Sequence, residues 1–339
     1  MENEFFMHKE IQESVKLIKE YSQRKTEFEG IYQKISNYDP NTVIFISRGT
    51  SDNAATYGKY VFEYAFSIPS SFASFSLYTW YKRYPKLKNV LGIAISQSGE
   101  TEDVVKVVET FNKENALSIG ITNNENSRLY KISDIPFLLR GGEEHSVSAT
   151  KTYTLTLMFF LHLANFVLKD IDFESLHKGV LYVLKNEDYI AKLTERYKFA
   201  KHFFILGRGF NYPTALEFAL KLRETSIVNA VGFSSVDFLH GPIASLTNET
   251  PVIFFLPKDE TYDSNLAILK RIKDEGGDVL VVSDVEGLNN LSFKIPSVST
   301  LLYPVVFAIF LQLFSFYLSR EKGLNPDKPS KLKKVTYGL

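Results

Sequence analysis

The chain has 339 residues, of which 45% are hydrophobic and 23% are charged, an ordinary balance for a globular protein long enough for two domains. Lysine plus arginine and aspartate plus glutamate each number 39, so the formal net charge is zero. This argues against bulk binding of nucleic acid or of an anionic membrane, which require a basic surface. The sequence contains no cysteine, which excludes disulfides, thiolate metal sites and a cysteine nucleophile.

Residues 1–38 are predicted to form a helical segment with little of the pattern found in the rest of the chain. The first residues, Met1 to Glu4, are acidic and lack the basic start of a secretory signal, so we expect a cytoplasmic protein. The segment is also too short, and too acidic at its start, for a convincing DNA-binding helix-turn-helix module.

The first strand-like run, residues 43–49, belongs to an internal repeat. Its sequence Val-Ile-Phe-Ile-Ser-Arg-Gly returns as Phe-Phe-Ile-Leu-Gly-Arg-Gly, so that Arg48 and Arg208 are 160 positions apart (208 − 48 = 160). Four matches at one offset, in order, predict a tandem duplication across the central part of the chain. The matched pairs are 43–49 with 203–209, 91–95 with 251–255, 119–123 with 279–283, and 135–136 with 295–296.

Helical patterns separate the repeated runs, for example at 52–66, 103–115 and 212–227. Continuous apolar strands that alternate with helices predict an α/β fold with a parallel sheet covered on both faces. We predict two tandem doubly wound, three-layer domains that bind ligands at the carboxyl ends of their strands. The predicted boundaries are 39–170 for the first domain, 171–200 for a helical linker, 201–320 for the second domain and 321–339 for a C-terminal tail.

Two long apolar runs, residues 147–168 and 301–318, follow the last strand of each half and are predicted to be buried helices that pack the halves or two subunits together. The second run reaches the lower length limit of a membrane span. It contains Pro304, Gln312 and Ser315 and ends in a charged cluster, so we expect a buried helix rather than a membrane span.

The segment Ser-Gln-Ser-Gly-Glu-Thr at residues 96–101 opens a predicted helix. Three hydroxyl side chains and one amide occupy six positions, and Gly99 lets the backbone approach a ligand. The free N–H groups at the start of the helix attract an anion. A plain N-cap needs one hydroxyl, and the matching loop of the second half, residues 256–261, has lost two serines. We therefore predict a phosphate cradle without lysine or arginine, with residues 48–52 as a second donor set for the sugar.

Candidate acids and bases lie in the second half. Glu224 follows Lys221 at the i+3 position of a predicted helix, so the two share a face, although the pair alone could be a surface ion pair. His240 lies in an apolar-flanked turn. A lone histidine there is often only a packing residue, yet imidazole is the side chain best suited to proton transfer near neutral pH.

Two other polar segments carry weaker signals. The Glu-Glu-His sequence at 143–145 could suggest a metal, but no other ligand spacing supports one, so neither a metal nor a cofactor is expected. The tail from residue 325 contains prolines that prevent a continuing helix, and it presents Lys331, Lys333 and Lys334. A solvated basic tail is the simpler interpretation of these lysines.

Six short motifs, spread over nearly the whole chain, occur together: Arg48–Asp52, Ser96–Thr101, Ser148–Lys151, Ala219–Glu224, His240–Pro242 and the tail Asn325–Thr336. Their combination resembles the sugar-isomerase (SIS) domain family. Within that family, the chain is similar to the isomerase half of glucosamine–fructose-6-phosphate aminotransferase and to the SIS-type glucosamine-6-phosphate deaminases.

The resemblance implies two SIS domains per chain and a homodimer whose active site is shared near the subunit interface. It implies a sugar-phosphate ligand, with the phosphate held by Ser96, Gln97, Ser98 and Thr101 and the sugar contacted by Thr50, Ser51, Ser148 and Ala149. It also implies four catalytic residues: Glu224 to move the proton between C1 and C2, His240 of the partner subunit to open the ring, Lys221 to support the open-chain form, and Lys334 near the substrate.

Two departures favour the deaminase over the aminotransferase. The aminotransferase carries a glutaminase domain with an N-terminal cysteine, and this chain has neither room for that domain nor a cysteine. It also has Ala149 where the aminotransferase has serine and the deaminase-type members have alanine. We therefore expect conversion of glucosamine 6-phosphate to fructose 6-phosphate and ammonia.

Several related activities stay open. They are deamination of another hexosamine 6-phosphate, aldose–ketose isomerisation of a phosphosugar, and deglycation of a sugar–amine phosphate, because the choice of epimer depends on the shape of the pocket. A hypothesis of another class is a sugar-phosphate-binding regulator, since SIS domains also occur in transcriptional regulators.

Overall fold

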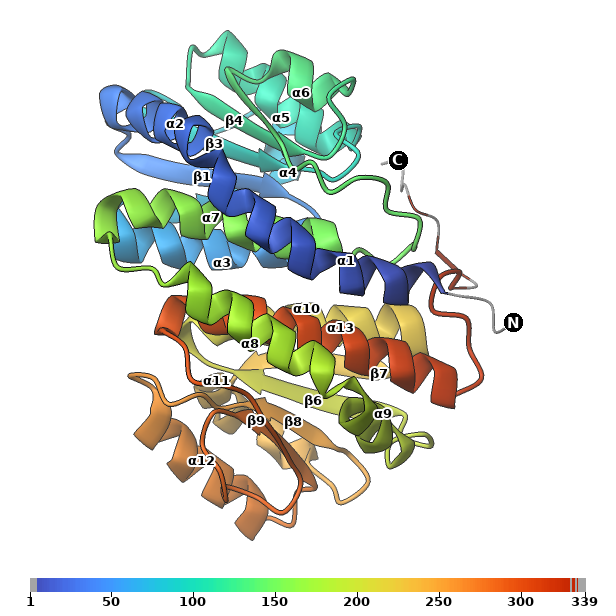
Figure 1. Ribbon diagram of the computed structural model, residues 1–339. Coiled ribbons are helices and arrows are strands. Elements are labelled where there is room, and N and C mark those ends of the chain that lie inside the picture. The colour runs from blue at the N-terminus through green and yellow to red at the C-terminus, as the bar shows by residue number, and fades with distance from the viewer. Residues whose placement is uncertain (1–4, 330, 333, 335–339) are drawn as a thin grey trace. The chain divides into compact units, whose positions relative to one another are not determined.

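The computed structural model describes residues 5–329, 331–332 and 334 and contains two compact units, each built around one sheet (Figure 1). The β1 unit comprises Leu17–Glu144, Lys151–Ile171 and Lys334. The β6 unit comprises residues 5–16, His145–Thr150 and the described part of Asp172–Leu332.

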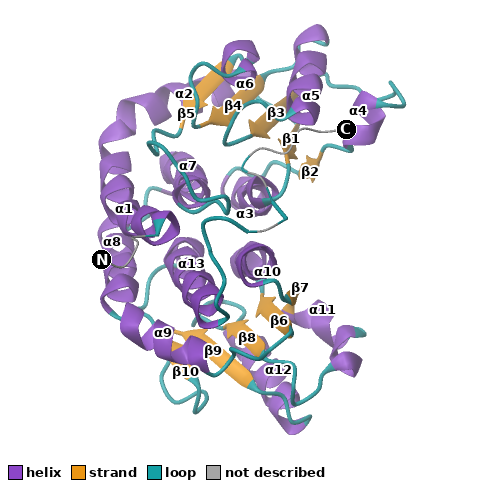
Figure 2. Ribbon diagram, turned by 90° about the vertical axis from the view of Figure 1, so that its right-hand side faces the viewer, coloured by secondary structure: helices purple, strands orange, loops and turns teal. Residues whose placement is uncertain are grey.

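The β1 unit has a five-stranded parallel sheet of order β2-β1-β3-β4-β5. Helices α3 and α7 cover one face and α5 and α6 cover the other (Figure 2). The elements are α2 (Lys25–Tyr38), β1 (Thr42–Ser47), α3 (Thr50–Ala65), β2 (Ser70–Phe72), α4 (Phe75–Thr79), β3 (Val90–Ile95), α5 (Glu102–Lys113), β4 (Ser118–Thr122), α6 (Arg128–Ile132), β5 (Ile135–Leu138) and α7 (Lys151–Leu168).

The β6 unit repeats this strand order as β7-β6-β8-β9-β10, again all parallel. Helices α10 and α13 lie on one face, and α11 and α12 lie on the other (Figure 2). The elements are α1 (Phe6–Tyr21, shared at its end with the β1 unit), α8 (Phe173–Lys185), α9 (Glu187–Glu195), β6 (His202–Gly207), α10 (Tyr212–Ser226), β7 (Asn229–Ser234), α11 (Ser235–Leu239), β8 (Val252–Phe255), α12 (Tyr262–Asp274), β9 (Val279–Ser283), β10 (Ser292–Lys294) and α13 (Tyr303–Glu321).

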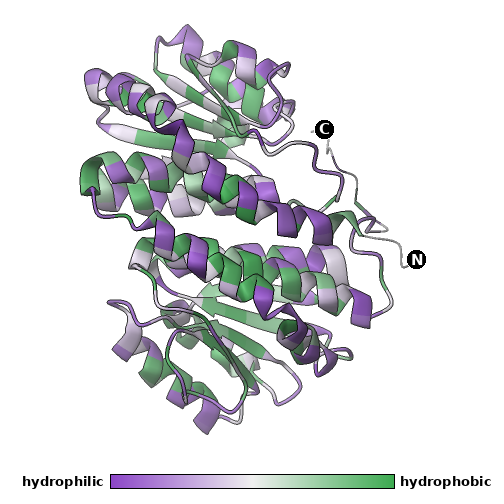
Figure 3. Ribbon diagram, viewed as in Figure 1, coloured by the Kyte–Doolittle hydropathy of each residue, from purple (hydrophilic) through white to green (hydrophobic). Residues whose placement is uncertain are grey.

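Strand β1 shows why the predicted strands are continuously apolar. The ring of Phe45 packs against Phe160 of α7, with 5.9 Å between centroids. Its neighbours Ile44 and Ile46 instead join the buried cluster that contains Val104 and other residues of α5. Because helices bury both faces, every position must be apolar, and Figure 3 shows the strands as the hydrophobic centre of each unit. The predicted α/β fold with two parallel, doubly wound sheets is confirmed.

The strand register preserves the duplication. In the β1 unit Ile44 pairs with Gly92, and in the β6 unit Phe204 pairs with Val252, each 160 positions later. At the next strand the offset is larger by one residue. Gly92 of β3 pairs with Ser118 of β4, whereas Val252 of β8 pairs with Val279 of β9, so these partners are 161 positions apart (279 − 118 = 161). The two halves are therefore most alike at the strands whose carboxyl ends carry the predicted ligand loops.

The fourth sequence match does not mark equivalent positions. Ile135 lies in β5, where it pairs with Ile119 of β4. Ile295, its counterpart at the repeat offset, comes after β10, whose last residue Lys294 pairs with Ser283. The connection that precedes β10 is shorter than its counterpart before β5, which destroys the constant offset at this edge of the sheet.

Both apolar runs form core helices. In the described part of the chain one helix, Thr300–Glu321, is long and apolar enough to cross a membrane, but 94% of its most apolar window is buried, as in the core helix of a globular protein. The prediction of a buried helix is confirmed here. The other run was predicted as a helix from residue 147, but α7 begins only at Lys151. Residues 147–150 instead form hydrogen bonds to other elements, with partners that include Glu10, Glu224 and Asp327.

The histidine in α7 makes the stability of the β1 unit depend on pH. His162 is 7% exposed and stacks on Phe28, with 4.7 Å between ring centroids. Burial and, to a smaller extent, the positive charge of Arg24 lower its pKa to about 4. An unfolded histidine titrates near 6.5, so the unfolded chain takes up a proton that the folded chain excludes.

The contribution of His162 to stability is complete above pH 6.5 and is lost as the pH falls towards 4. We expect the free energy of unfolding to fall by about 2 kcal/mol between pH 7 and pH 5 through this group. In His162→Phe this contribution to the pH dependence disappears. Denaturant titrations of both proteins at the two pH values measure the difference, and equal losses in both would contradict the role of His162.

Candidate functional site

The strand order of the β1 unit places a topological switch between β1 and β3, which connect to opposite edges of the sheet. Such switch points are where open parallel sheets bind ligands. Ser47 at the end of β1 pairs with Ile95 at the end of β3, so the loops that follow the two strands begin side by side. One loop leads to Thr50 and Ser51, which lie half-buried in the first turn of α3.

The loop of residues 96–101 follows β3 and leads directly into α5. The Ser96 hydroxyl is buried, accepts the Gly99 N–H at 3.1 Å and lies 3.0 Å from the Thr101 hydroxyl. The Ser98 hydroxyl accepts the Glu100 N–H at 3.2 Å. Gln97, Ser98 and Thr101 are half-buried. The structure thus gathers the four predicted phosphate ligands on one turn that solvent can reach.

The loop has a backbone support that sequence reasoning missed. Gly99 has a φ of +66°, and a Cβ added there would lie 2.1 Å from the Ser127 Oγ and 2.8 Å from the Thr122 Oγ1. The Gln97 carbonyl accepts the Asn123 N–H at 3.0 Å. The sequence signal that could have predicted this support is the polar stretch of residues 122–127, which begins at the last residue of β4.

The arginine nearest to these loops in the sequence is occupied elsewhere. The Arg48 guanidinium forms an ion pair of 2.8 Å with Asp103 and lies 3.8 Å above the centre of the Phe75 ring. A second cation, Arg128, bonds the carboxylate and the carbonyl of Glu100 in the loop itself. The loop's own donors are hydroxyls, N–H groups and the start of α5, and the cradle without a cation stays a prediction.

The corresponding loop of the β6 unit satisfies its own polar groups. The Asp259 carboxylate accepts the Thr261 N–H at 2.8 Å and the Thr261 hydroxyl at 2.6 Å, and Asn265 donates to that same hydroxyl. Burial raises the pKa of Asp259 above its ordinary value. An anion would meet a carboxylate here rather than three hydroxyls.

The β6 unit instead carries a buried acid–base cluster on α10. The Lys221 ammonium is fully buried and lies 3.0 Å from Glu217 and 2.9 Å from Glu224. Burial alone would lower the pKa of Lys221, but the two carboxylates outweigh it and raise the pKa above the ordinary value. Lys221 is therefore a cation at neutral pH. Glu217 was not predicted, although its i−4 spacing from Lys221 on a helix was a usable signal.

The loop of residues 145–150 joins this cluster. The Ser148 hydroxyl donates to the Glu224 Oε2 at 2.7 Å, and Lys221 bonds the same oxygen. The Glu224 side chain keeps 21% of its surface exposed, whereas Glu217 and Lys221 have none. Two fixed donors on Oε2 hold the carboxylate while part of it faces solvent. Ala149 lies half-buried in the same loop.

His240 is not brought to this cluster within its own unit. It follows the last residue of α11, is exposed, and its backbone N–H bonds the Asp237 carbonyl at 3.0 Å. No hydrogen bond or ion pair found among the described residues joins it to Glu224 or Lys221. Its assignment to the active site of the partner subunit stays a prediction.

The tail lysine has a definite partner. The Lys334 ammonium lies 3.1 Å from the Glu144 Oε2, and the Glu144 side chain is fully buried. Glu144 also accepts the N–H and the hydroxyl of Thr152, the second residue of α7. Sequence reasoning had considered Glu144 only as a metal ligand. Of the other tail lysines, Lys331 is exposed and Lys333 lies outside the described residues.

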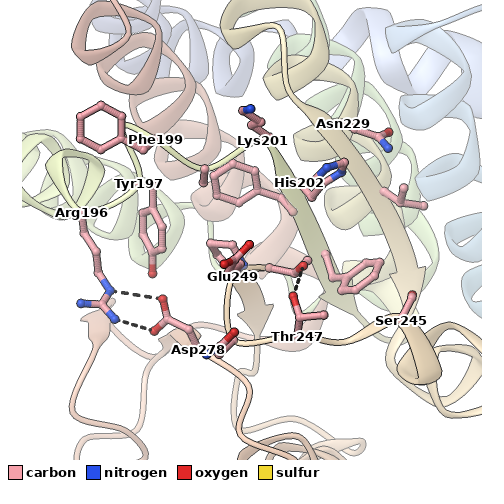
Figure 4. Close-up of a pocket in the computed structure, with 17 residues that line it drawn as sticks. Arg196, Tyr197, Phe199, Lys201, His202, Asn229, Ser245, Thr247, Glu249 and Asp278 are labelled. Carbon is pink, nitrogen blue, oxygen red and sulfur yellow. Dashed lines mark hydrogen bonds and ion pairs between the residues drawn. The ribbon is translucent and has the colours of Figure 1, made fainter.

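A cavity of about 930 Å³ in the β6 unit lies at the amino ends of the strands, away from the carboxyl ends that carry the predicted ligand loops (Figure 4). Its wall includes His202 at the start of β6, Thr250 just before β8, and Asp278, which forms a 3.0 Å ion pair with Arg196. None of the predicted site residues lines it. Because ligands of parallel sheets bind at the carboxyl ends, we place the site at the loops and not in this cavity.

Comparison with known proteins agrees with the motifs. The model of the SIS domain family matches residues 38–165 and 197–319. The glutamine–fructose-6-phosphate aminotransferase of Thermococcus kodakarensis is 33% identical over an alignment 347 positions long, gaps included, which covers 97% of this chain and 57% of that protein. The chain thus spans little more than half the length of this curated relative. The resemblance drawn from the motifs is confirmed.

Solved structures show the same fold. The C-terminal domain of glucosamine-fructose-6-phosphate aminotransferase from Francisella tularensis superposes with a TM-score of 0.85 at 27% identity, covering 97% of this chain and 99% of that one. A glucosamine-6-phosphate deaminase from Thermotoga maritima superposes with a TM-score of 0.80, covering 98% and 99%. At its 24% identity, the second likeness bears on the fold alone.

The loop geometry predicts that Gly99→Ala weakens the binding of inorganic phosphate about tenfold or more, because the new methyl group would displace Ser127 and the required φ is strained. Titration followed by ³¹P NMR measures the affinity. Gly287→Ala is the matched control, since Gly287 also has a positive φ, of +75°, but open space around it. Equal affinity for phosphate in Gly99→Ala and the unaltered chain would refute the cradle.

Proposed function

Because this chain belongs to the SIS domain family, we propose that it is a cytoplasmic phosphosugar enzyme that moves a proton between C1 and C2 of a hexosamine 6-phosphate and releases its amino group as ammonia. Glucosamine 6-phosphate is the proposed substrate, and fructose 6-phosphate is the proposed product. One observation carries the proposal: a partly exposed carboxylate, Glu224, held on one oxygen by a buried ammonium and a hydroxyl.

The phosphate end of the substrate binds at the loop of residues 96–101. A phosphate dianion accepts hydrogen bonds from Ser96, Ser98 and Thr101 and from the N–H groups that begin α5. The Ser96 and Ser98 hydroxyls already accept backbone N–H groups, so their own protons can turn towards the phosphate. Thr50, Ser51 and Ala149 are assigned to the sugar.

Proton transfer belongs to Glu224. In the open-chain aldehyde, Glu224 removes the C2 proton, the C2–H electron pair forms a C1–C2 double bond, and the aldehyde oxygen gains a proton. Return of the proton to C1 leaves a hydroxymethyl group at C1 and an imine at C2. Water adds to the imine carbon and ammonia leaves, which gives the ketose. General acid–base catalysis of this kind requires a carboxylate within reach of both carbons.

The other predicted catalytic residues receive supporting roles. Lys221 holds Glu224 and supplies positive charge beside the developing enolate. Lys334, paired with the buried Glu144, is proposed to act as a cation near the sugar. His240 is proposed to open the ring from the partner subunit of a homodimer, which accounts for its exposed position away from α10.

Ala149 favours release of ammonia over glutamine-dependent amination. The alignment with the aminotransferase of Thermococcus kodakarensis covers only 57% of that protein. The aminotransferase activity of the whole relative therefore does not transfer to this chain by similarity.

The Glu224→Gln variant tests the proposed base. We expect turnover of glucosamine 6-phosphate to fall at least about a hundredfold, with substrate affinity within about threefold, because the amide keeps the shape and loses the basic oxygen. Exchange of the C2 proton in D₂O, followed by ¹H NMR, should stop as well. Glu249→Gln, at an exposed glutamate lining the distant cavity, is the control and keeps full activity. Unchanged exchange in Glu224→Gln would remove Glu224 from the mechanism.

A substrate panel tests the reaction class. Glucosamine 6-phosphate, galactosamine 6-phosphate, fructose 6-phosphate and an amine-linked fructose 6-phosphate are incubated without glutamine, and free ammonia and sugar products are followed by NMR. We expect ammonia and fructose 6-phosphate from glucosamine 6-phosphate. Interconversion of aldose and ketose phosphates without release of ammonia would instead identify an aldose–ketose isomerase.

A further inference from the structure

Glu10 is a buried carboxylate on α1, far in the sequence from every residue of the proposed site. It is 3% exposed. Its Oε1 accepts the N–H groups of His145 and of Ser146, the latter at 3.2 Å, and its Oε2 accepts the Thr150 hydroxyl at 3.1 Å. A carboxylate is expensive to bury unless it receives several hydrogen bonds, and here its partners lie at both ends of one loop.

The same loop is fixed from two further directions. The Thr150 carbonyl accepts the Gln312 amide of α13 at 3.1 Å, and the Val147 N–H bonds the Asp327 carbonyl at 3.2 Å. The Asp327 carboxylate in turn accepts the N–H groups of Phe6 and Met7 at the start of α1, at 2.9 and 2.8 Å. The loop of residues 145–150 forms neither helix nor strand. It is held instead by hydrogen bonds to α1, α13 and the segment after α13.

Ser148 lies at the middle of this loop and donates to Glu224. We propose that Glu10 is a positioning residue, which fixes the backbone on both sides of Ser148 and thereby keeps the Ser148 hydroxyl on the Glu224 Oε2. This inference rests on the proposed function for the importance of Glu224. It adds that the proton-transferring carboxylate is oriented from the N-terminal helix.

The chemistry of the contacts explains why a carboxylate is present at position 10. Its two oxygens accept three hydrogen bonds, so one side chain constrains residues 145, 146 and 150 together. A glutamine can imitate this arrangement, because its carbonyl accepts both N–H groups and its amide donates to the Thr150 hydroxyl, which can reverse its direction. An alanine cannot, and leaves the N–H groups of His145 and Ser146 without this acceptor.

A double-mutant cycle in the full chain tests the proposal. We expect Glu10→Ala and Ser148→Ala each to lower kcat for glucosamine 6-phosphate about tenfold with KM within about twofold, and the double variant to lose no more than the worse single variant. Glu10→Gln should keep most of the activity. Glu20→Ala, at an exposed carboxylate on the last turn of α1, is the control and should be unchanged.

A second measurement does not depend on turnover. The ¹³C chemical shift of the Glu224 carboxyl carbon is compared in the same variants at one pH. The groups shown to contact this carboxylate are the Lys221 ammonium, which also binds Glu217, and the Ser148 hydroxyl. We expect the signal to move in both single variants, because each loses the Ser148 hydrogen bond, and to move no further in the double variant.

The outcomes separate the two proposals. Additive losses in the cycle, or a Glu224 carboxyl signal in Glu10→Ala at the same position as in the unaltered chain, would overturn the positioning role. If Glu10→Ala fails to fold by circular dichroism, Glu10→Asp takes its place in both measurements, since its shorter side chain cannot reach both ends of the loop. If the unaltered chain turns over no hexosamine 6-phosphate, the proposed function fails, and the chemical shift of the Glu224 carboxyl carbon still decides the role of Glu10.

Discussion

The proposed chemistry depends on the ion pairs that the buried Lys221 ammonium forms with Glu217 and Glu224. A lysine with no exposed surface must be paired, and α10 supplies Glu217 and Glu224 on the same face one turn away in each direction. Of the two carboxylates, only Glu224 keeps part of its surface in solvent. Removal of the ammonium would leave two acids facing one another in the core, which is far more costly than the loss of an exposed pair. The cluster therefore fixes the rotamer of Glu224 before any ligand arrives.

Duplication accounts for how one fold could supply two kinds of chemistry. The halves share strand order and register where β1, β3, β6 and β8 pair. Their side chains diverge where the scaffold is most alike: at the repeat offset of 160, Glu217, Lys221 and Glu224 of α10 correspond to Tyr57, Val61 and Tyr64 of α3. The hydroxyl loop after β3 has likewise become the self-satisfied Asp259 loop in the β6 unit. Under the proposed function, the β1 unit supplies the phosphate loop and the β6 unit supplies the acid–base cluster, while both have a sheet whose carboxyl ends can present such groups.

The sequence predicted features that depend on short-range patterns. The apolar runs of the strands, the helices between them, the hydroxyl loop and the i+3 pair of Lys221 and Glu224 follow from spacings of a few residues. The start of α7 was predicted wrongly because residues 147–150 bond to partners such as Glu10 and Asp327, which are remote in sequence. The roles of Glu10 and Glu144 could not be predicted for the same reason. A buried carboxylate and a solvated one look alike in a charged helix, and only the fold tells them apart.

The choice of hydroxyls over cations at the phosphate loop has a consequence for turnover. Arginine would hold a dianion more tightly, but Arg48, in the loop after β1, is engaged by Asp103 and Phe75. Arg128 is likewise paired with Glu100 and Glu102. The phosphate does not change during proton transfer, so tighter binding there would stabilise substrate, transition state and product alike and would not raise kcat. Under the proposed function, moderate binding of the phosphate by Ser96, Ser98 and Thr101 is sufficient, and it lets the product leave. The acid–base cluster, whose contacts change as the proton moves, is where additional interaction energy can increase the rate.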